Sequence, residues 1–107
     1  MNRALRTLPA AHLDTLSCFE FLSECNGMAR AWHFIDCLEQ SYERIMQMPY
    51  IGAQRTFKRA TLRNLRQWPV KEFNDYLIFY RVTKTRIDIC RILHGRRDIE
   101  AVFSKRH

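Results

Sequence analysis

The pattern of apolar and polar positions is strongest in the C-terminal half of the chain. Residues 76–82 are mostly β-branched or aromatic, residues 83–85 are polar, and residues 86–94 alternate isoleucine with polar side chains. This pattern predicts two antiparallel strands joined by a short turn. Residues 62–68 also alternate and predict a third strand, which we expect Pro69 to end.

The predicted strand at residues 76–82 has two different faces, because alternate side chains point to opposite sides. The expected core face carries Tyr76, Ile78, Tyr80 and Val82. The other face carries Leu77, Phe79 and Arg81. This second face is too apolar to be bare, so we expect the C-terminal tail, a second copy of the chain or a partner peptide to cover part of it. Residues 71–75 form the expected turn before this strand.

Two helices are predicted in the N-terminal half, over about residues 9–24 and 28–48. Pro9 suits the first turn of the first helix, and Asn26 with Gly27 ends it, which gives a helical hairpin. The core stripe expected on the first helix is Ala11, Cys18, Phe21, Leu22 and Cys25. The stripe expected on the second helix is Trp32, Ile35, Leu38, Tyr42, Ile45 and Met46.

Short segments complete the predicted fold. Residues 4–8 predict a first strand, at an edge of the sheet or beside its last strand. Residues 53–61 form a connector over the rim of the sheet, and residues 97–103 close the chain as a short helix or an extended tail. The predicted fold is a single α+β domain, residues 1–107, in the order β-α-α-β-β-β. A short N-terminal strand and a helical hairpin pack on an antiparallel sheet of three to four strands.

Length and cysteine content exclude several classes of protein. A chain of 107 residues is long enough to bury a core of its own. Its apolar runs are too short to cross a membrane and its first residues lack the apolar core of a signal peptide, so we expect a cytoplasmic protein without a membrane partner. The four cysteines form no C-x-x-C pair, and we expect reduced thiols in the core, no metal site and no cofactor. His33, in the second helix, is expected to pack or to lie on the surface.

The charge of the chain is unevenly distributed. The net charge is +7, yet residues 9–43 hold six acidic residues and one basic residue, whereas residues 44–107 hold fifteen basic residues and five acidic ones. The asymmetry predicts a basic surface on the C-terminal half that suits nucleic acid or an acidic protein. A basic face that only keeps the protein in solution is the alternative.

Several short motifs together resemble those of the RelE/ParE superfamily of bacterial toxins from toxin–antitoxin pairs. They are Pro49-x-x-Gly52, Leu62-Arg63, Tyr76-x-Ile78-x-Tyr80-Arg81-Val82 and Ile87-x-Ile89-x-Arg91-x-Leu93-His94-Gly95-x-Arg97-Asp98. The resemblance covers about residues 4–103 and implies the same β-α-α-β-β-β order. It also implies a cytoplasmic toxin that a cognate antitoxin neutralises in a hetero-oligomer, by wrapping an acidic segment around it.

The resemblance leaves two activities open, inhibition of DNA gyrase by binding, as in ParE-like members, and cleavage of messenger RNA on the ribosome, as in RelE-like members. Cleavage requires a base, an acid and cations for the transition state. The nuclease alternative would use Arg63, Tyr80, Arg81 and His94. RelE-like members often use a C-terminal tyrosine or histidine to move protons, and the last ten residues of this chain contain no tyrosine. His94 before Gly95 fits a structural role at the end of a strand better than a catalytic role. The stretch Trp68-Pro69-Val70-x-x-Phe73-x-x-Tyr76-x-Ile78-x-Tyr80-Arg81-Val82 resembles the ParE-like members more closely. The resemblance therefore implies a ParE-like gyrase inhibitor with no catalytic residue.

The candidates for contact with an antitoxin or a target are basic and apolar residues of the predicted sheet and its flanks. They are Arg63, Arg66, Leu77, Phe79, Arg81, Arg91, Arg96 and Arg97. Carboxylates of a disordered acidic segment would pair with the arginines while its apolar side chains fill grooves.

Overall fold

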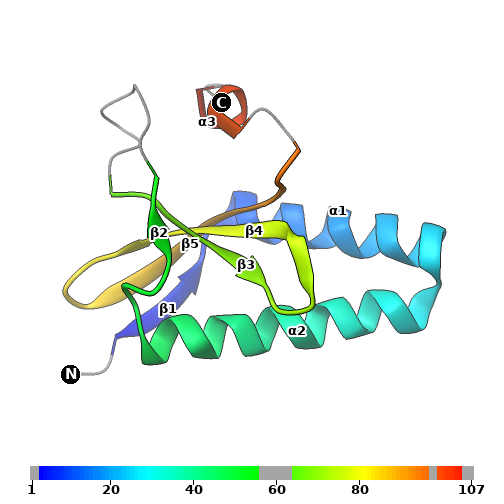
Figure 1. Ribbon diagram of the computed structural model, residues 1–107, viewed down its shortest axis with the longest axis horizontal. Coiled ribbons are helices and arrows are strands. Elements are labelled where there is room, and N and C mark those ends of the chain that lie inside the picture. The colour runs from blue at the N-terminus through cyan, green and yellow to red at the C-terminus, as the bar shows by residue number, and fades with distance from the viewer. Residues whose placement is uncertain (1–2, 56–63, 97–98, 105–107) are drawn as a thin grey trace.

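The computed structural model describes residues 3–55, 64–96 and 99–104. Two long helices lie on one side of a twisted sheet and a short C-terminal helix lies on the other (Figure 1). The elements are β1 (Ala4–Thr7), α1 (Pro9–Asn26), α2 (Met28–Gln47), β2 (Ala53–Gln54), β3 (Arg66–Val70), β4 (Phe73–Val82), β5 (Arg86–His94) and α3 (Ile99–Ser104). The predicted α+β class, helical hairpin and C-terminal strand pair are confirmed.

The sheet has more strands than predicted and combines parallel with antiparallel pairing. Its described strands follow the order β1-β5-β4-β3-β2, which is five strands instead of three to four. β1 runs parallel to β5, and the remaining neighbours are antiparallel. The first strand therefore lies beside the last one, which was one of the two predicted places. The connector at residues 53–61 contributes β2, and its remaining residues from 56 onward lie outside the described part.

The third predicted strand begins later and ends later than expected. β3 passes through Pro69, which is paired with Leu77 of β4. β2 pairs only with Arg66 and Gln67, so Pro69 lies on an edge, where a missing N–H costs no ladder hydrogen bond on the open side. The register shifts between Pro69 and Val70, which is typical of a β-bulge beside a proline.

The turn between β3 and β4 is shorter than the predicted residues 71–75. Val70 pairs with Phe73, so Lys71 and Glu72 alone make the turn. Glu72 has a φ of 64°, a left-handed conformation that a side chain other than glycine adopts at a cost.

Two apolar clusters lie on opposite faces of the sheet. The larger one joins both long helices to the face that carries Ile78 and Tyr80. The smaller one contains Phe79 and Leu93 with residues of α3, and the ring centroids of Phe79 and Phe103 are 5.5 Å apart in an edge-on contact. Of the three covers expected for the second face, the C-terminal tail is the one present here, and it takes the form of a short helix.

The predicted core stripes of the helices are only partly correct. Ala11 and Leu22 of α1 are buried, and Ile35, Leu38, Tyr42 and Ile45 of α2 pack in the core. Phe21, Cys25, Trp32 and Met46 are exposed, contrary to prediction. The connected ends of α1 and α2 project beyond the strands (Figure 1). All four cysteines are free, and only Cys37 and Cys90 are buried.

The hydroxyl of Tyr80 fixes the chain that leaves α2. It accepts a hydrogen bond from the Gly52 N–H at 2.8 Å and donates one to the Pro49 carbonyl oxygen at 2.8 Å. A Cβ at Gly52 would lie 2.5 Å from this hydroxyl and 2.8 Å from the backbone oxygen of Gln67. Glycine is required here because the backbone of residue 52 lies against both β3 and β4.

We expect Gly52→Ala to lower the free energy of unfolding by about 1–3 kcal/mol, since the added methyl group overpacks a rigid contact. Urea unfolding of the purified chain measures this change. Gly95→Ala is the matched control, because its Cβ would meet only ordinary contacts, the nearest at 3.5 Å. An equal effect of the two substitutions would contradict the role assigned to Gly52.

Candidate binding surface

The guanidinium group of Arg91 is held inside the molecule by Asp14. Arg91 donates two hydrogen bonds to the Asp14 carboxylate, at 2.7 and 2.9 Å, and the same carboxylate accepts the backbone N–H of Ile92 at 2.9 Å. β1 pairs with β5 only as far as Ile89, so Asp14 bonds the edge of β5 just beyond the end of β1. The hydrogen bonds that Arg91 donates to Asp14 raise the pKa of Arg91. Arg91 thus attaches α1 to β5.

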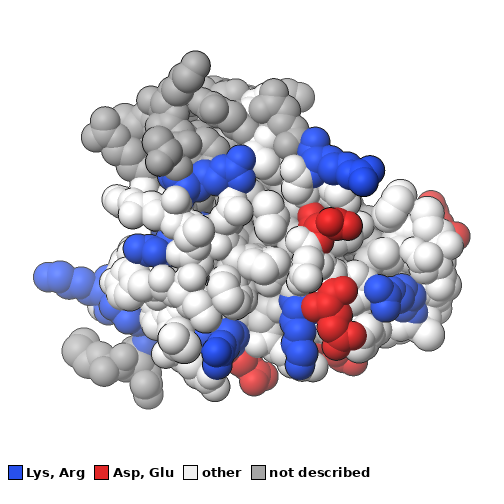
Figure 2. Space-filling view, in the orientation of Figure 1, with Lys and Arg blue, Asp and Glu red and all other residues white. Residues whose placement is uncertain are grey.

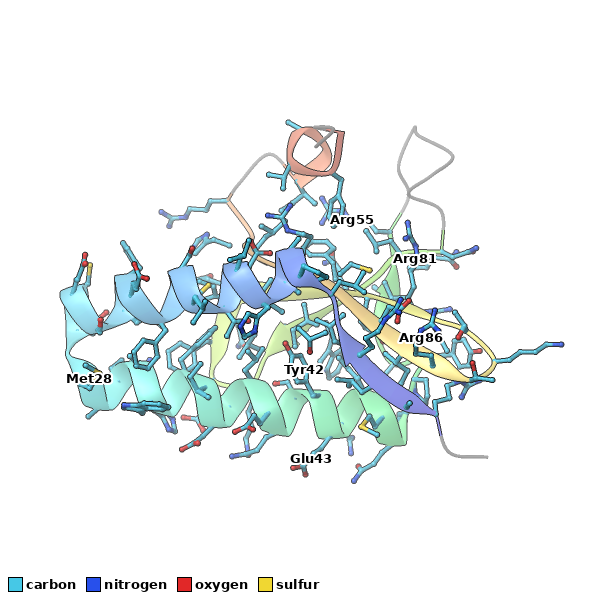
Figure 3. The ribbon with its side chains drawn as sticks, turned by 180° about the vertical axis from the view of Figure 1, so that it is seen from behind. Met28, Tyr42, Glu43, Arg55, Arg81 and Arg86 are labelled. Carbon is cyan, nitrogen blue, oxygen red and sulfur yellow. The ribbon has the colours of Figure 1, made fainter. Side chains whose placement is uncertain are left out.

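Asp88 pairs with two further arginines of the sheet. Its carboxylate pairs with Arg6 of β1 at 3.2 Å and with Arg86 of β5 at 2.7 Å. Burial would raise the pKa of Asp88, but the hydrogen bond from Arg86 and the charge of Arg6 outweigh it and hold the pKa below its usual value. Arg81 lies opposite Asp88 on β4, and Figure 3 shows Arg81 and Arg86 on the same region of the sheet.

Arg66 is also engaged within the chain. Its guanidinium donates hydrogen bonds to the carbonyl oxygens of Gly52, at 2.8 Å, and Tyr50, at 3.3 Å, and it lies 5.0 Å from the centroid of the Tyr50 ring. Arg66 thus fastens the segment that follows α2 to β3, and this role is structural.

The other predicted contact residues have different environments. Phe79 is fully buried beneath α3 and is not accessible to a partner in this structure. Leu77 is half-buried against the same cluster, and Arg96 is exposed beyond the end of β5. Arg63 and Arg97 lie outside the described residues. Arg66 and Arg91, which were predicted to meet the anions of a partner, are therefore bound to carbonyl and carboxylate groups of the protein itself.

Tyr80 and His94, two residues of the nuclease alternative, are not brought together. Tyr80 is fully buried, and burial raises the pKa of its hydroxyl. His94 lies opposite Tyr76, four residues from Tyr80 along β4, or roughly 13 Å at the rise of a strand. Its Nδ1 accepts the backbone N–H of Arg96 at 3.1 Å. An acid and a base acting on one phosphate need to converge within hydrogen-bond reach, and these two side chains do not.

An apolar groove lies between α1 and the exposed edge of β5. It has a volume of about 390 Å³. It is lined by Asp14, Ser17, Cys18, Phe21, Tyr76, Ile92, Leu93 and His94. Phe21 is 57% exposed, and the ring of His94 contacts that of Tyr76 edge-on, with centroids 5.2 Å apart. We call this recess the α1–β5 groove.

Sequence reasoning missed most of the α1–β5 groove. Phe21 was assigned to the core, and Ser17, Tyr76 and Ile92 received no binding role. These residues come from segments about 60 residues apart in the sequence, so no local pattern connects them. The one available signal was Asp14, an acid within the apolar surface of the first predicted helix.

Basic and acidic side chains occupy different parts of the surface. Figure 2 shows acidic side chains mainly on the half that holds the α1–α2 hairpin, and basic ones extending to the edge formed by β2 and the β4–β5 turn. The uneven distribution predicted from the sequence is thus visible on this face. Among the described residues, no helix is long and apolar enough to cross a membrane.

One group of described side chains has the composition of a metal site. His33, Cys37 and Glu72 place a ring nitrogen, a sulfur and a carboxylate oxygen within 4.8 Å of one another. No metal site was predicted from the sequence. His33 and Cys37 nevertheless stand four residues apart, a spacing that puts both side chains on one face of a helix. Glu72 comes from a separate element and joins them only in the fold.

Comparison with known proteins gives consistent matches. The model of the family described as ParE toxin of type II toxin-antitoxin system, parDE, matches residues 5–99. Toxin ParE3 of Caulobacter vibrioides is 29% identical over 107 residues, which cover 99% of each chain. A solved structure described as the chromosomal ParDE TA system from P. aeruginosa has a TM-score of 0.71 at 17% identity. The match covers 86% of this chain and 95% of that one, and it shows the shared fold.

The Asp88 contacts predict a pH dependence of stability. Because the pKa of Asp88 is lower in the folded chain, its contribution is complete above the unfolded pKa of about 4 and is lost as the pH falls through the folded pKa. We expect Asp88→Asn to cost roughly 1–2 kcal/mol of unfolding free energy at neutral pH. The difference from the original chain should shrink on acidification. Urea unfolding between neutral and strongly acidic pH measures it, and a difference that does not change with pH would contradict this assignment.

Proposed function

Since the chain belongs to the family of ParE toxins of type II toxin–antitoxin systems, we propose that it inhibits DNA gyrase by binding and that a cognate antitoxin neutralises it. Toxin and antitoxin then form a hetero-oligomer, and the toxin needs no cofactor. The alternative within the superfamily is a ribosome-dependent nuclease that cuts messenger RNA.

The separation of Tyr80 from His94 is the observation that favours binding over cleavage. The Tyr80 hydroxyl is buried and holds Gly52 and Pro49, so moving it toward a phosphate would break the packing between α2 and the sheet. His94 borders the α1–β5 groove instead. A histidine and an aromatic ring at the rim of an apolar recess suit recognition of a protein segment.

The α1–β5 groove supports a specific proposal for the antitoxin. Its walls are apolar at Phe21, Tyr76 and Ile92, and the exposed Arg96 follows the end of β5. An antitoxin segment with apolar side chains for the groove and acidic ones for the basic surface fits both features. The net charge of +7 favours the same acidic partner.

The two candidate targets are separated by direct assays of the purified toxin. We expect supercoiling by gyrase to fall and cleaved DNA to accumulate as toxin is added, and we expect cells that express the chain without antitoxin to stop growing. Normal supercoiling at micromolar toxin, together with codon-linked cuts of messenger RNA in a translation extract, would instead establish the nuclease alternative. Absence of growth arrest would contradict both activities.

We expect Phe21→Ala to weaken antitoxin binding at least tenfold, because it removes an apolar anchor from the groove. The free energy of unfolding should change little, since the ring is largely exposed. Met46→Ala is the matched control, because Met46 is an exposed apolar residue outside the groove. Calorimetric titration of the toxin with the antitoxin measures both affinities, and equal affinities of the two variants would place the antitoxin elsewhere.

A further inference from the structure

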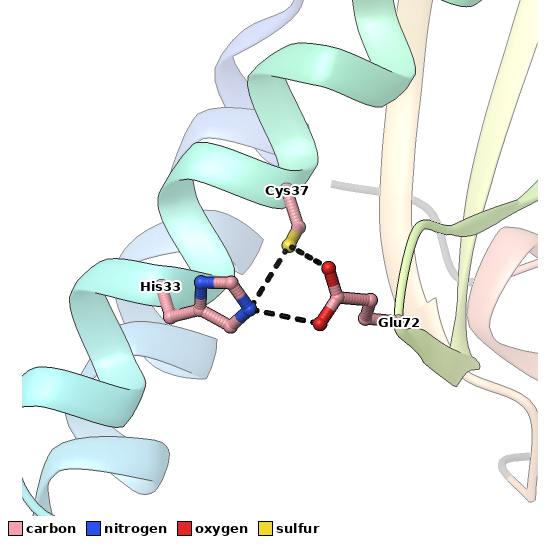
Figure 4. A group of neighbouring side chains, drawn as sticks. All are labelled: His33, Cys37 and Glu72. Atoms are coloured by element: carbon pink, nitrogen blue, oxygen red, sulfur yellow. Dashed lines mark hydrogen bonds and ion pairs between the residues drawn. The ribbon is translucent and has the colours of Figure 1, made fainter.

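The side chains of His33, Cys37 and Glu72 converge where α2 meets the β3–β4 turn (Figure 4). The His33 Nε2 lies 3.0 Å from one Glu72 carboxylate oxygen, and the Cys37 sulfur lies 3.6 Å from Nε2 and 3.9 Å from the other carboxylate oxygen. All three contacts join ligand atoms that zinc binds in proteins. An ion pair needs only His33 and Glu72, so the contact of the Cys37 sulfur with both of them is the feature that indicates a metal site.

These separations can be compared with those of ligands around one tetrahedral zinc ion. With metal–ligand bonds of about 2.3 Å to sulfur and about 2.1 Å to nitrogen or oxygen, tetrahedral angles place sulfur about 3.6 Å from either atom, and nitrogen about 3.4 Å from oxygen. The observed separation of 3.6 Å between the Cys37 sulfur and the His33 Nε2 equals the expected value. The two contacts of Glu72 are made by different carboxylate oxygens, Oε1 to Nε2 and Oε2 to the sulfur, and with one ligand atom from each residue all three atoms lie within 4.8 Å of one another. A rotation of the Glu72 side chain that brings one oxygen toward both other ligands would accommodate the ion.

The backbone holds the three side chains in position. His33 and Cys37 project from successive turns of α2, and the Lys71 N–H donates to the Ser41 hydroxyl at 2.9 Å, which fixes the β3–β4 turn against the same helix. Lys71 Nζ also donates to the Gln40 side-chain oxygen at 2.7 Å. The next residue, Glu72, has the left-handed φ of 64°, which costs free energy and is often found at functional sites.

We propose that His33, Cys37 and Glu72 bind a single Zn²⁺ ion, with water as the fourth ligand, and that the ion links α2 to the β3–β4 turn. The thiolate and the carboxylate together carry two negative charges, which cancel the charge of the ion. The thiol proton leaves to solvent when the Zn–S bond forms. His33 and Glu72 have side chains 42% and 53% exposed, so the ion and its water can enter from solvent.

The site is independent of the proposed toxin activity, because it lies on α2 and the β3–β4 turn while the α1–β5 groove lies on other residues. A metal at this junction would stabilise the position of α2 on the sheet. Borderline-soft sulfur and nitrogen ligands with one carboxylate favour zinc over magnesium or calcium, which prefer all-oxygen sites.

The test is a titration of the full chain, purified without a polyhistidine tag, with Co²⁺ as a spectroscopic substitute for zinc. We expect a near-ultraviolet thiolate-to-cobalt band and visible bands of a tetrahedral ion, both saturating at one equivalent and removed by one equivalent of Zn²⁺. Cys37→Ser should abolish the thiolate band. His33→Gln and Glu72→Gln should each weaken Zn²⁺ binding at least tenfold.

Cys25→Ser is the matched control, because Cys25 is an exposed thiol on α1 and should leave the titration unchanged. A second readout is the melting temperature, which zinc should raise in the original chain and in Cys25→Ser but not in Glu72→Gln. Glu72 is exposed, so this variant is expected to fold. Absence of the thiolate band, or a band that persists in Cys37→Ser, would overturn the proposal whatever the outcome of the gyrase and antitoxin assays.

Discussion

The β4–β5 strand pair is apolar on both faces, so each face has to be covered, and most of the chain is arranged around this requirement. Ile78 and Tyr80 face the helical hairpin, while Phe79 and Leu93 face α3. A sheet covered on one side would leave Phe79 in water, where an exposed aromatic cluster favours association. The short C-terminal helix removes that surface. Among the described residues, large apolar side chains remain exposed along α1, at both ends of α2 and just after α2.

The same packing determines what the arginines can do. A guanidinium group at the edge of an apolar sheet needs an anionic or carbonyl partner nearby, because unpaired burial is costly. Asp14 and Asp88 meet this need for Arg91, Arg6 and Arg86, and backbone carbonyl groups meet it for Arg66. Positive charge that looks available in the sequence is therefore partly used to join elements.

The fold was largely predictable from local patterns, and the candidate site was not. The β4 and β5 strands and the helical hairpin follow from periodicity and from Gly27, because each signal is contained within one element. Pro69 was predicted to end the strand, but β3 passes through it. A strand accepts proline only where the missing N–H needs no partner, and here that depends on where β2 stops pairing with β3, which no local pattern shows. The roles of Arg91 and Phe21 likewise depend on how α1 lies against β5. That placement is set by contacts such as Asp14 with Ile92, across 78 residues, which no periodicity encodes.

The junction between α2 and the β3–β4 turn both attaches the hairpin to the sheet and contains the proposed zinc ligands. α1 is attached to the sheet by Asp14. α2 is attached through Ser41 and Gln40 and through the group formed by His33, Cys37 and Glu72. Both attachments leave the connected ends of the helices projecting beyond the strands (Figure 1). The proposed ion would add one more link between α2 and the sheet, and it would touch none of the residues that line the α1–β5 groove.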